Sequence, residues 1–99
     1  MEPFEIALTP EAVEDIGVLT TFEQRLLLDA IEARLAYEPL TETRNRKPLE
    51  PNDLSAWEMR VGRLRVFYDV DTIERRVTVK AAGWKEREKL IIRGKEYRL

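Results

Sequence analysis

The 99-residue sequence contains no cysteine and no histidine. Without cysteine the chain has no disulfide, no thiolate nucleophile and no zinc-finger spacing. Without histidine it lacks the commonest metal ligand and the side chain that most often transfers protons at neutral pH. Any catalysis by this chain therefore uses neither residue, and we expect no cofactor.

Long apolar stretches are also missing. The longest uncharged runs, residues 16–22 and 81–84, are far shorter than a membrane span, and the acidic start of the chain resembles neither a signal peptide nor a transit peptide. A composition of 43% hydrophobic and 36% charged residues excludes a disordered chain. We therefore expect a single domain covering residues 1–99, in the cytoplasm and without a membrane partner.

The charge is distributed unevenly. Residues 1–43 carry two basic and ten acidic side chains, whereas residues 44–99 carry fifteen basic and nine acidic ones, ten of the fifteen being arginine. A polyanion would therefore meet the C-terminal half, where arginine can form bidentate phosphate contacts. A sequence pI near 5.3 is low for a nucleic-acid binder, and an ordinary solvated surface explains the same counts.

The first 38 residues predict a strand followed by a helical hairpin. Residues 4–8 alternate as in a short strand, and residues 9–11, Thr-Pro-Glu, form an N-cap for a helix ending near Gly17. Residues 20–24 hold two overlapping capping boxes, Thr20 with Glu23 and Thr21 with Gln24. The apolar residues that then repeat at helical spacing up to Pro39 are Leu27, Leu28, Ile31 and Leu35.

The rest of the chain predicts a loop and an antiparallel meander. Residues 41–53 are polar and flanked by proline, so we expect a loop, and it carries Arg44, Arg46 and Lys47. From Ala56 onward the pattern has period two, and residues 90–92 can add a last short strand. The residues expected on one face of the strands are Trp57, Met59, Val61, Leu64, Val66, Tyr68, Val70, Val77, Val79 and Ala81. The fold class is therefore α+β, with a three- to four-stranded antiparallel sheet.

Two arginines should meet on the other face of this sheet. If Gly62 and Arg63 form a two-residue hairpin turn, Arg60 lies directly opposite Arg65, at an outward position with little burial. Like charges paired across strands cost roughly 0.2–1 kcal/mol, so an anion or carboxylate is expected nearby. The other residues on this face are Glu58, Phe67, Asp69, Thr78 and Lys80.

This face allows two interpretations. One is a basic groove with an exposed aromatic, Phe67, suited to a single-stranded nucleic acid. The other is a surface ion-pair network in which Glu58 and Asp69 neutralise the arginines. Asp69 and Asp71 share a face, but they lack the further ligands that Mg²⁺ would require, so no metal site is predicted.

RNA cleavage remains open to such a chain. The nucleophile, the 2′-hydroxyl, belongs to the substrate, and the protein has only to orient it and neutralise charge on the phosphate, which Arg and Lys can do. A general base is harder to supply, and a desolvated lysine, Lys85 or Lys47, is the candidate.

Three segments, residues 46–49, 55–71 and 79–87, resemble the RelE/ParE superfamily of type II toxins. The most specific part is a hairpin, Trp57-x-x-Arg60-Val61-Gly62-x-x-Arg65-Val66-x-Tyr68-x-Val70, followed by Gly83-x-Lys85-x-Arg87. The resemblance covers nearly the whole chain. It implies a β-α-α-β-β-β order and a partner antitoxin. RelE-like members cut mRNA in the ribosomal A site, and ParE-like members inhibit DNA gyrase.

The resemblance also implies site residues. Arg65 matches the family's arginine in the second meander strand, Lys85 falls at the basic position after the last glycine, and Arg60 and Arg87 match neighbouring basic positions. These four form the expected catalytic set. The expected RNA-binding residues are Arg44, Arg46, Lys47, Arg63, Phe67 and Lys80.

Two positions depart from the family pattern. Glu58 occupies a strand position that is usually basic. Ile91 aligns with the C-terminal tyrosine of RelE-like enzymes, and Tyr97 follows a few residues later. The sequence therefore leaves three hypotheses: a ribosome-dependent mRNA endonuclease, a non-enzymatic inhibitor of gyrase, and a weakened toxin acting mainly in antitoxin binding and autoregulation.

Overall fold

A computed structural model describes residues 2–98 of the chain. The N-terminal elements are strand β1 (Glu5–Leu8), helix α1 (Pro10–Gly17), helix α2 (Thr21–Ala30) and a π-helical continuation, η1 (Ile31–Leu35). The strands that follow are β2 (Arg46–Pro48), β3 (Trp57–Val61), β4 (Leu64–Asp71), β5 (Arg76–Glu86), β6 (Lys89–Ile92) and β7 (Lys95–Tyr97). The predicted order of strand, helical hairpin and antiparallel meander is confirmed.

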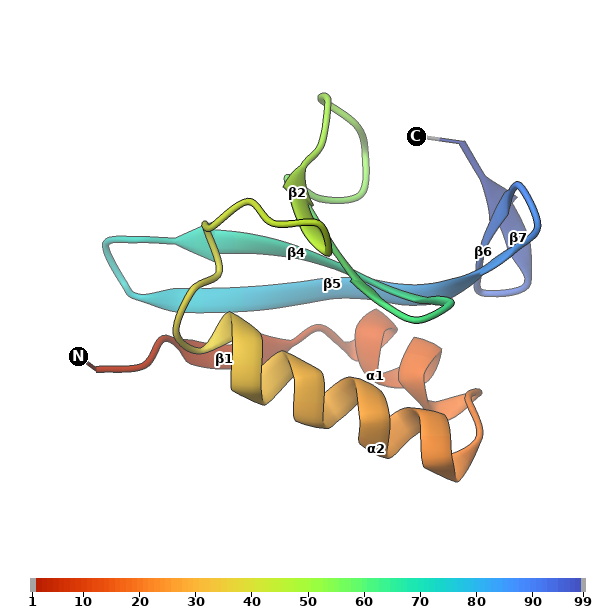
Figure 1. Ribbon diagram of the computed structural model, residues 1–99, viewed down its shortest axis with the longest axis horizontal. Helices are drawn as coiled ribbons and strands as arrows, with labels where there is room; N and C mark the ends of the chain where they lie inside the picture. Colours follow the sequence, from red (N-terminus) through yellow and green to blue (C-terminus); the bar gives the residue numbers. More distant parts are fainter. Residues whose placement is uncertain (1, 99) are drawn as a thin grey trace.

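All the strands join one sheet. Strands β2 to β7 lie in chain order and pair antiparallel, while β1 pairs in parallel with the first part of β5. The last residues of β5 pair with β6 along the same edge. Two strands, β1 and β6, therefore share one edge of β5. Helices α1 and α2 cover one face of the sheet, while the loop after β2 and the β6–β7 hairpin rise from the other face (Figure 1).

The helices begin where the sequence predicts. The Thr9 side chain accepts a hydrogen bond from the Ala12 amide, and Thr20 and Glu23 form a reciprocal capping box. The second predicted box does not form, because the Gln24 amide donates to the carbonyls of Gly17 and Leu19.

The face of the sheet toward the helices carries the main apolar core. Leu27, Ile31 and Leu35 from the helical stripe are buried, but Leu28 is exposed, which corrects its predicted place in that stripe. The fully buried Tyr68 donates a hydrogen bond from its hydroxyl to the Pro39 carbonyl at 2.7 Å. Burial raises the pKa of Tyr68. The hydrogen bond from Tyr68 to Pro39 fixes β4 to the end of the helical hairpin.

A β-bulge in β5 breaks the alternation of side chains between the two faces of the sheet. Phe67 lies opposite Ala81, but the next residue, Tyr68, lies opposite Val79, so Lys80 is the extra residue. Ala81 therefore turns to the face away from the helices and packs with Phe67. The prediction that Ala81 continues the face of Val79 is wrong, because strict alternation cannot anticipate an inserted residue.

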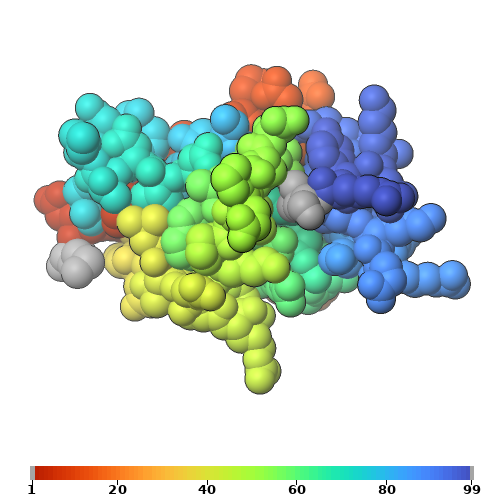
Figure 2. Space-filling view, turned by 90° about the horizontal axis from the view of Figure 1, so that it is seen from above, coloured from red at the N-terminus to blue at the C-terminus, as the bar shows by residue number. Residues whose placement is uncertain are grey.

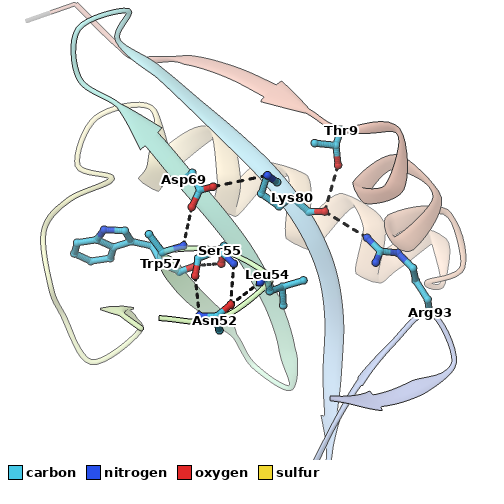
Figure 3. A network of polar contacts seen from close by, with 9 residues as sticks. Thr9, Asn52, Leu54, Ser55, Trp57, Asp69, Lys80 and Arg93 are labelled. Atoms are coloured by element: carbon cyan, nitrogen blue, oxygen red, sulfur yellow. Dashed lines mark hydrogen bonds and ion pairs between the residues drawn. The ribbon is translucent and has the colours of Figure 1, made fainter. Parts of the chain in front are cut away.

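Polar side chains satisfy the backbone groups around this bulge. Asp15 of α1 accepts a hydrogen bond from the Ala82 amide at 3.1 Å. The Lys80 carbonyl accepts hydrogen bonds from Thr9 at 3.2 Å and from Arg93 at 3.4 Å (Figure 3). Arg93 also pairs with Asp15 at 3.0 Å. Burial raises the pKa of Asp15, although the Ala82 amide and Arg93 oppose this shift. The bulge thus connects α1 to the turn between β6 and β7.

Two short strands were not predicted. Strand β2 lies inside the segment expected to be a loop, where it pairs with β3 at the edge of the sheet. Strand β7 follows a tight turn at Arg93 and Gly94, which both have positive φ, 54° and 73°. Two consecutive residues with positive φ are typical of a type I′ hairpin turn. The predicted strand at residues 90–92 therefore becomes half of a hairpin.

Candidate active-site cleft

A cleft of about 890 Å³ opens on the face of the sheet that the helices leave free. Seen from above, β2 and the loop after it (green) and the C-terminal hairpin (blue) stand on this face (Figure 2). The lining residues are Lys47, Pro48, Leu49, Glu50, Glu58, Arg60, Lys85, Glu88, Leu90, Glu96, Tyr97 and Arg98. They come from β2, the loop after it, β3, the end of β5 and the hairpin, which are far apart in the sequence.

The walls of the cleft are held in place by a small apolar cluster. Phe67, Ala81, Leu90 and Ile92 are buried between the sheet and the hairpin, and Leu49, Leu54 and Tyr97 pack against them. The Asn52 side chain fixes the loop after β2 by accepting hydrogen bonds from the amides of Leu54 at 2.6 Å and Ser55 at 3.0 Å (Figure 3). The loop after β2 and the C-terminal hairpin, which form the two walls, therefore belong to the same cluster as the buried Phe67 ring.

The predicted pairing of Arg60 with Arg65 is present, and Gly62 adopts the positive φ, 60°, that the turn requires. The two side chains differ in their surroundings. Arg60 is 43% exposed and lines the cleft, whereas Arg65 is only 9% exposed and donates to the carbonyls of Gly62 at 2.8 Å and Leu64 at 2.9 Å. The expectation that Arg65 is an outward side chain with little burial is wrong, because its guanidinium folds under the turn.

Burial lowers the pKa of Arg65, and the charge of Glu58 opposes this shift. Glu58 itself is 8% exposed, and its Oε1 lies 3.6 Å from Arg60 Nε. Asp69 faces Lys80 at 3.9 Å and accepts a hydrogen bond from the Ala56 amide. The ion-pair interpretation is therefore correct for Glu58 with Arg60, but Asp69 neutralises Lys80 and not an arginine.

The expectation of an exposed aromatic at Phe67 is wrong. Its ring has no exposed surface, since the loop after β2 and the C-terminal hairpin cover that face. Phe67 therefore cannot stack on a base. The aromatic side chain that reaches the cleft is Tyr97.

Tyr97 is the functional candidate that the pattern analysis underrated. It pairs with Leu90, which pairs with Lys85, so these residues form one row across three strands. Ile91 pairs with Trp84 in the neighbouring row and does not line the cleft. The turn signal at Arg93 and Gly94 could have revealed this, since a hairpin there returns the chain beside Leu90.

Of the predicted catalytic and binding residues, the cleft gathers Arg60, Lys85 and Lys47. Arg87 is exposed at the turn between β5 and β6, with a positive φ of 57°, and does not line the cleft. Arg44 is exposed in the loop before β2. The geometry thus separates a central set of cations from peripheral ones.

Two other predicted RNA-binding residues make structural contacts. Arg46 is 9% exposed and donates to the carbonyls of Glu38 at 2.5 Å and Arg34 at 3.4 Å. Arg63 pairs with Glu23 at 2.9 Å and lies over the Trp84 ring at 5.5 Å. The hydrogen bond from Arg63 lowers the pKa of Glu23. Both arginines connect the sheet to the helices.

The lining of the cleft can bind phosphate groups. Its four cations, Lys47, Arg60, Lys85 and Arg98, can contact phosphate oxygens, and four carboxylates are interspersed among them. Within residues 2–98, no three potential ligands from His, Cys, Asp and Glu gather as a metal site would require. No helix in this part of the chain has the length and apolar character of a membrane span.

Comparison with known proteins gives similarity in structure alone: no protein-family model and no curated protein matches the chain. A chain of the toxin–antitoxin complex RelBE2 from Mycobacterium tuberculosis aligns at 23% identity with a TM-score of 0.74, over 84% of this chain and 99% of that chain. A chain of the archaeal RelE–RelB complex from Pyrococcus horikoshii aligns at 22% identity with a TM-score of 0.69, over 85% and 97%. The α+β fold is thus the RelE fold, as the sequence resemblance implies.

Proposed function

We propose that this chain, which has the fold of RelE toxins, is the toxin of a type II toxin–antitoxin system and acts in the cytoplasm as a ribosome-dependent mRNA endonuclease. Residues 1–99 form its toxin domain, and a cognate antitoxin binds and restrains it. The observation that carries the proposal is the cleft, where Arg60, Lys85 and Lys47 surround a space of about 890 Å³ beside Tyr97. That size suits one or two nucleotides.

Each residue has a role in this reaction. Arg60 and Lys85 neutralise the charge that develops on the scissile phosphate as the substrate 2′-hydroxyl attacks it. Lys47 holds a neighbouring phosphate, and Tyr97 offers a ring on which a base stacks. Arg65 acts indirectly, since its hydrogen bonds to the turn fix the strand that carries Arg60. Arg44 and Arg87 contact RNA or ribosome outside the cleft.

The test is to map mRNA ends in a reconstituted translation reaction. New A-site ends are expected with the wild-type chain and should vanish with the double variant Arg60→Ala/Lys85→Ala. The matched control, Arg25→Ala/Arg34→Ala, removes the same charge from exposed positions of the helices and should cleave like the wild type. Intact mRNA with the wild-type chain would contradict the proposal.

A second candidate function follows from the four carboxylates of the cleft. Glu50, Glu58, Glu88 and Glu96 balance its cations, and a cleft without net positive charge attracts a polyanion weakly. This favours a ParE-like inhibitor of DNA gyrase or a weakened toxin acting through antitoxin binding and autoregulation. Loss of supercoiling by purified gyrase without mRNA cleavage would support the former, and antitoxin binding with neither activity the latter.

A further inference from the structure

The cleft contains one carboxylate that is unlike the others. Glu58 is nine-tenths buried at the base of the cleft, whereas Glu50, Glu88 and Glu96 are exposed. Its Oε1 is fully buried and accepts no hydrogen bond. A buried acceptor without a donor is costly, so such an atom in a cleft calls for an explanation.

The neighbouring arginines do not satisfy this carboxylate. Arg60 Nε is 3.6 Å from Oε1, too far for a hydrogen bond, and the Arg60 side chain is 43% exposed. Arg65 Nη1 donates to the carbonyls of Gly62 and Leu64, and the buried Arg65 Nε makes no hydrogen bond to Glu58 or to any other group. A carboxylate that served only as a counter-ion for these arginines would be expected to bind one of them directly.

The position of Glu58 places it among the groups that would hold an RNA phosphate. Lys47 lies directly opposite it on β2 as an exposed ammonium, and Arg60 follows it by two residues on the same face of β3. When Arg60 moves onto a phosphate, the carboxylate keeps its place because its strand is paired on both sides. A ribose attached to a phosphate held by Lys47 and Arg60 would lie beside this carboxylate, because all three residues line the same part of the cleft.

We propose that Glu58 is the general base of this site, the group that removes the proton from the 2′-hydroxyl of the scissile nucleotide. This inference rests on the proposed endonuclease function. The 2′-oxygen forms a bond to phosphorus while the bond from phosphorus to the 5′-oxygen breaks. The 2′ proton passes to the Glu58 carboxylate, and the leaving 5′-oxygen takes a proton from the Lys85 ammonium. The products are a 2′,3′-cyclic phosphate and a 5′-hydroxyl, and exchange with water restores both side chains.

The assignment explains how the site dispenses with histidine. Glu58 supplies the base that the sequence otherwise lacks, and the strand position that departs from the family's basic pattern becomes the catalytic one. Lys47 and Lys85, the lysines considered as bases, remain cations that bind phosphate or donate a proton.

The test measures single-turnover mRNA cleavage on programmed ribosomes with an excess of the full chain. Glu58→Gln keeps the size and shape of the side chain, and we expect its rate to fall by about 10²- to 10⁴-fold, the usual contribution of a general base. Binding to ribosomes carrying an mRNA with 2′-deoxyribose in the A-site codon should be unchanged. The matched control is Glu86→Gln, which removes the same charge from an exposed residue outside the cleft.

The outcomes separate the two proposals. Cleavage by the wild type with an undiminished rate in Glu58→Gln overturns the role of Glu58 and leaves the endonuclease intact. No cleavage by the wild type overturns both. Thermal unfolding verifies that Glu58→Gln is folded; if it is not, Glu58→Asp retains the carboxylate one methylene farther back, and a rate equal to that of the wild type would again overturn the proposal.

Discussion

The two faces of the sheet differ in what holds them together. The face toward the helices carries a continuous apolar core that includes Leu27, Met59 and Tyr68, and its few polar contacts are buried. The opposite face has a smaller apolar cluster, in which Phe67 packs with the buried Ala81, Leu90 and Ile92, and charged side chains surround this cluster. One face therefore carries the larger apolar core, and the other combines a small apolar cluster with the charged side chains of the cleft.

The same contrast appears between two residues that face each other. Arg60 and Arg65 are direct cross-strand partners, yet Arg60 reaches into the cleft, where it forms an ion pair with Glu58, and Arg65 is hydrogen-bonded to the turn. Identical side chains at paired positions thus have different surroundings: one lines the cleft and the other holds the turn. The following predictions test this division.

The largest effect is expected at Phe67. Phe67→Ala should lower the free energy of unfolding by about 3–5 kcal/mol, because it empties the centre of the smaller cluster. Urea denaturation measures this loss. Phe22→Ala removes the same atoms from a residue that is 75% exposed and should change stability little. Similar losses in both variants would mean that the second cluster is not a core.

A smaller loss, about 1–3 kcal/mol from overpacking, is expected for Gly83→Ala. A Cβ at this position would collide with the Ile91 carbonyl and lie 2.8 Å from Ile92 Cγ1. The added methyl group therefore separates β5 from β6 on the cleft side. Faster amide hydrogen exchange in β6 and β7, with α1 and α2 unchanged, would show that the damage is confined to one face. Uniform acceleration would contradict that division.

Arg65→Ala and Arg60→Ala should have opposite profiles. Loss of the Arg65 side chain removes one buried and one partly buried hydrogen bond, to the carbonyls of Leu64 and Gly62, and should cost about 1–3 kcal/mol in unfolding free energy. Arg60→Ala should stay within about 0.5 kcal/mol, as at most surface positions, while abolishing cleavage. Thermal unfolding and the mRNA assay, run on both variants, measure the two effects. Equal unfolding free energies for the two variants would show that the hydrogen bonds of Arg65 contribute nothing to stability.

The smallest effect is expected at Asp15, on the helix side. Because burial raises its folded-state pKa above the ordinary 3.8, the protonated form stabilises the fold. That contribution is fully present below pH 3.8 and is lost as the pH rises through the raised value. The stability of the wild type relative to Asp15→Asn should therefore fall with increasing pH, as urea denaturation at several pH values would show. If the stability of the wild type relative to Asp15→Asn rises with pH instead, the ion pair with Arg93 outweighs the effect of burial on the Asp15 pKa.

Local signals in the sequence were sufficient for most of the fold. The caps at Thr9 and Thr20, the turn at Gly62 and the alternation after Ala56 all act through neighbouring residues, and each gave the correct element. The register of the arginine pair followed from the same turn. These features could be read because their physical causes lie within a few positions of one another.

The environments of the site residues could not be predicted in the same way. The burial of Phe67 and Arg65 depends on the loop after β2 and on the C-terminal hairpin, which are distant in the sequence. The bulge at Lys80 is an insertion that alternation cannot reveal. The cleft itself exists only where three such distant segments meet. Composition and spacing therefore named three of its cations, Lys47, Arg60 and Lys85, but missed Arg98. They also could not separate Arg60 from Arg46 or Arg65.

The parallel pairing of β1 with β5 has a consequence for synthesis of the chain. Residue 5 pairs with residue 76, and the helices between them pack on strands that lie still later in the sequence. During translation the helical hairpin leaves the ribosome first, with its apolar side uncovered until β4 and β5 have followed. Such distant contacts slow folding and prolong the exposure of apolar surface. The nascent chain therefore cannot close its cleft until the β6–β7 hairpin has been made.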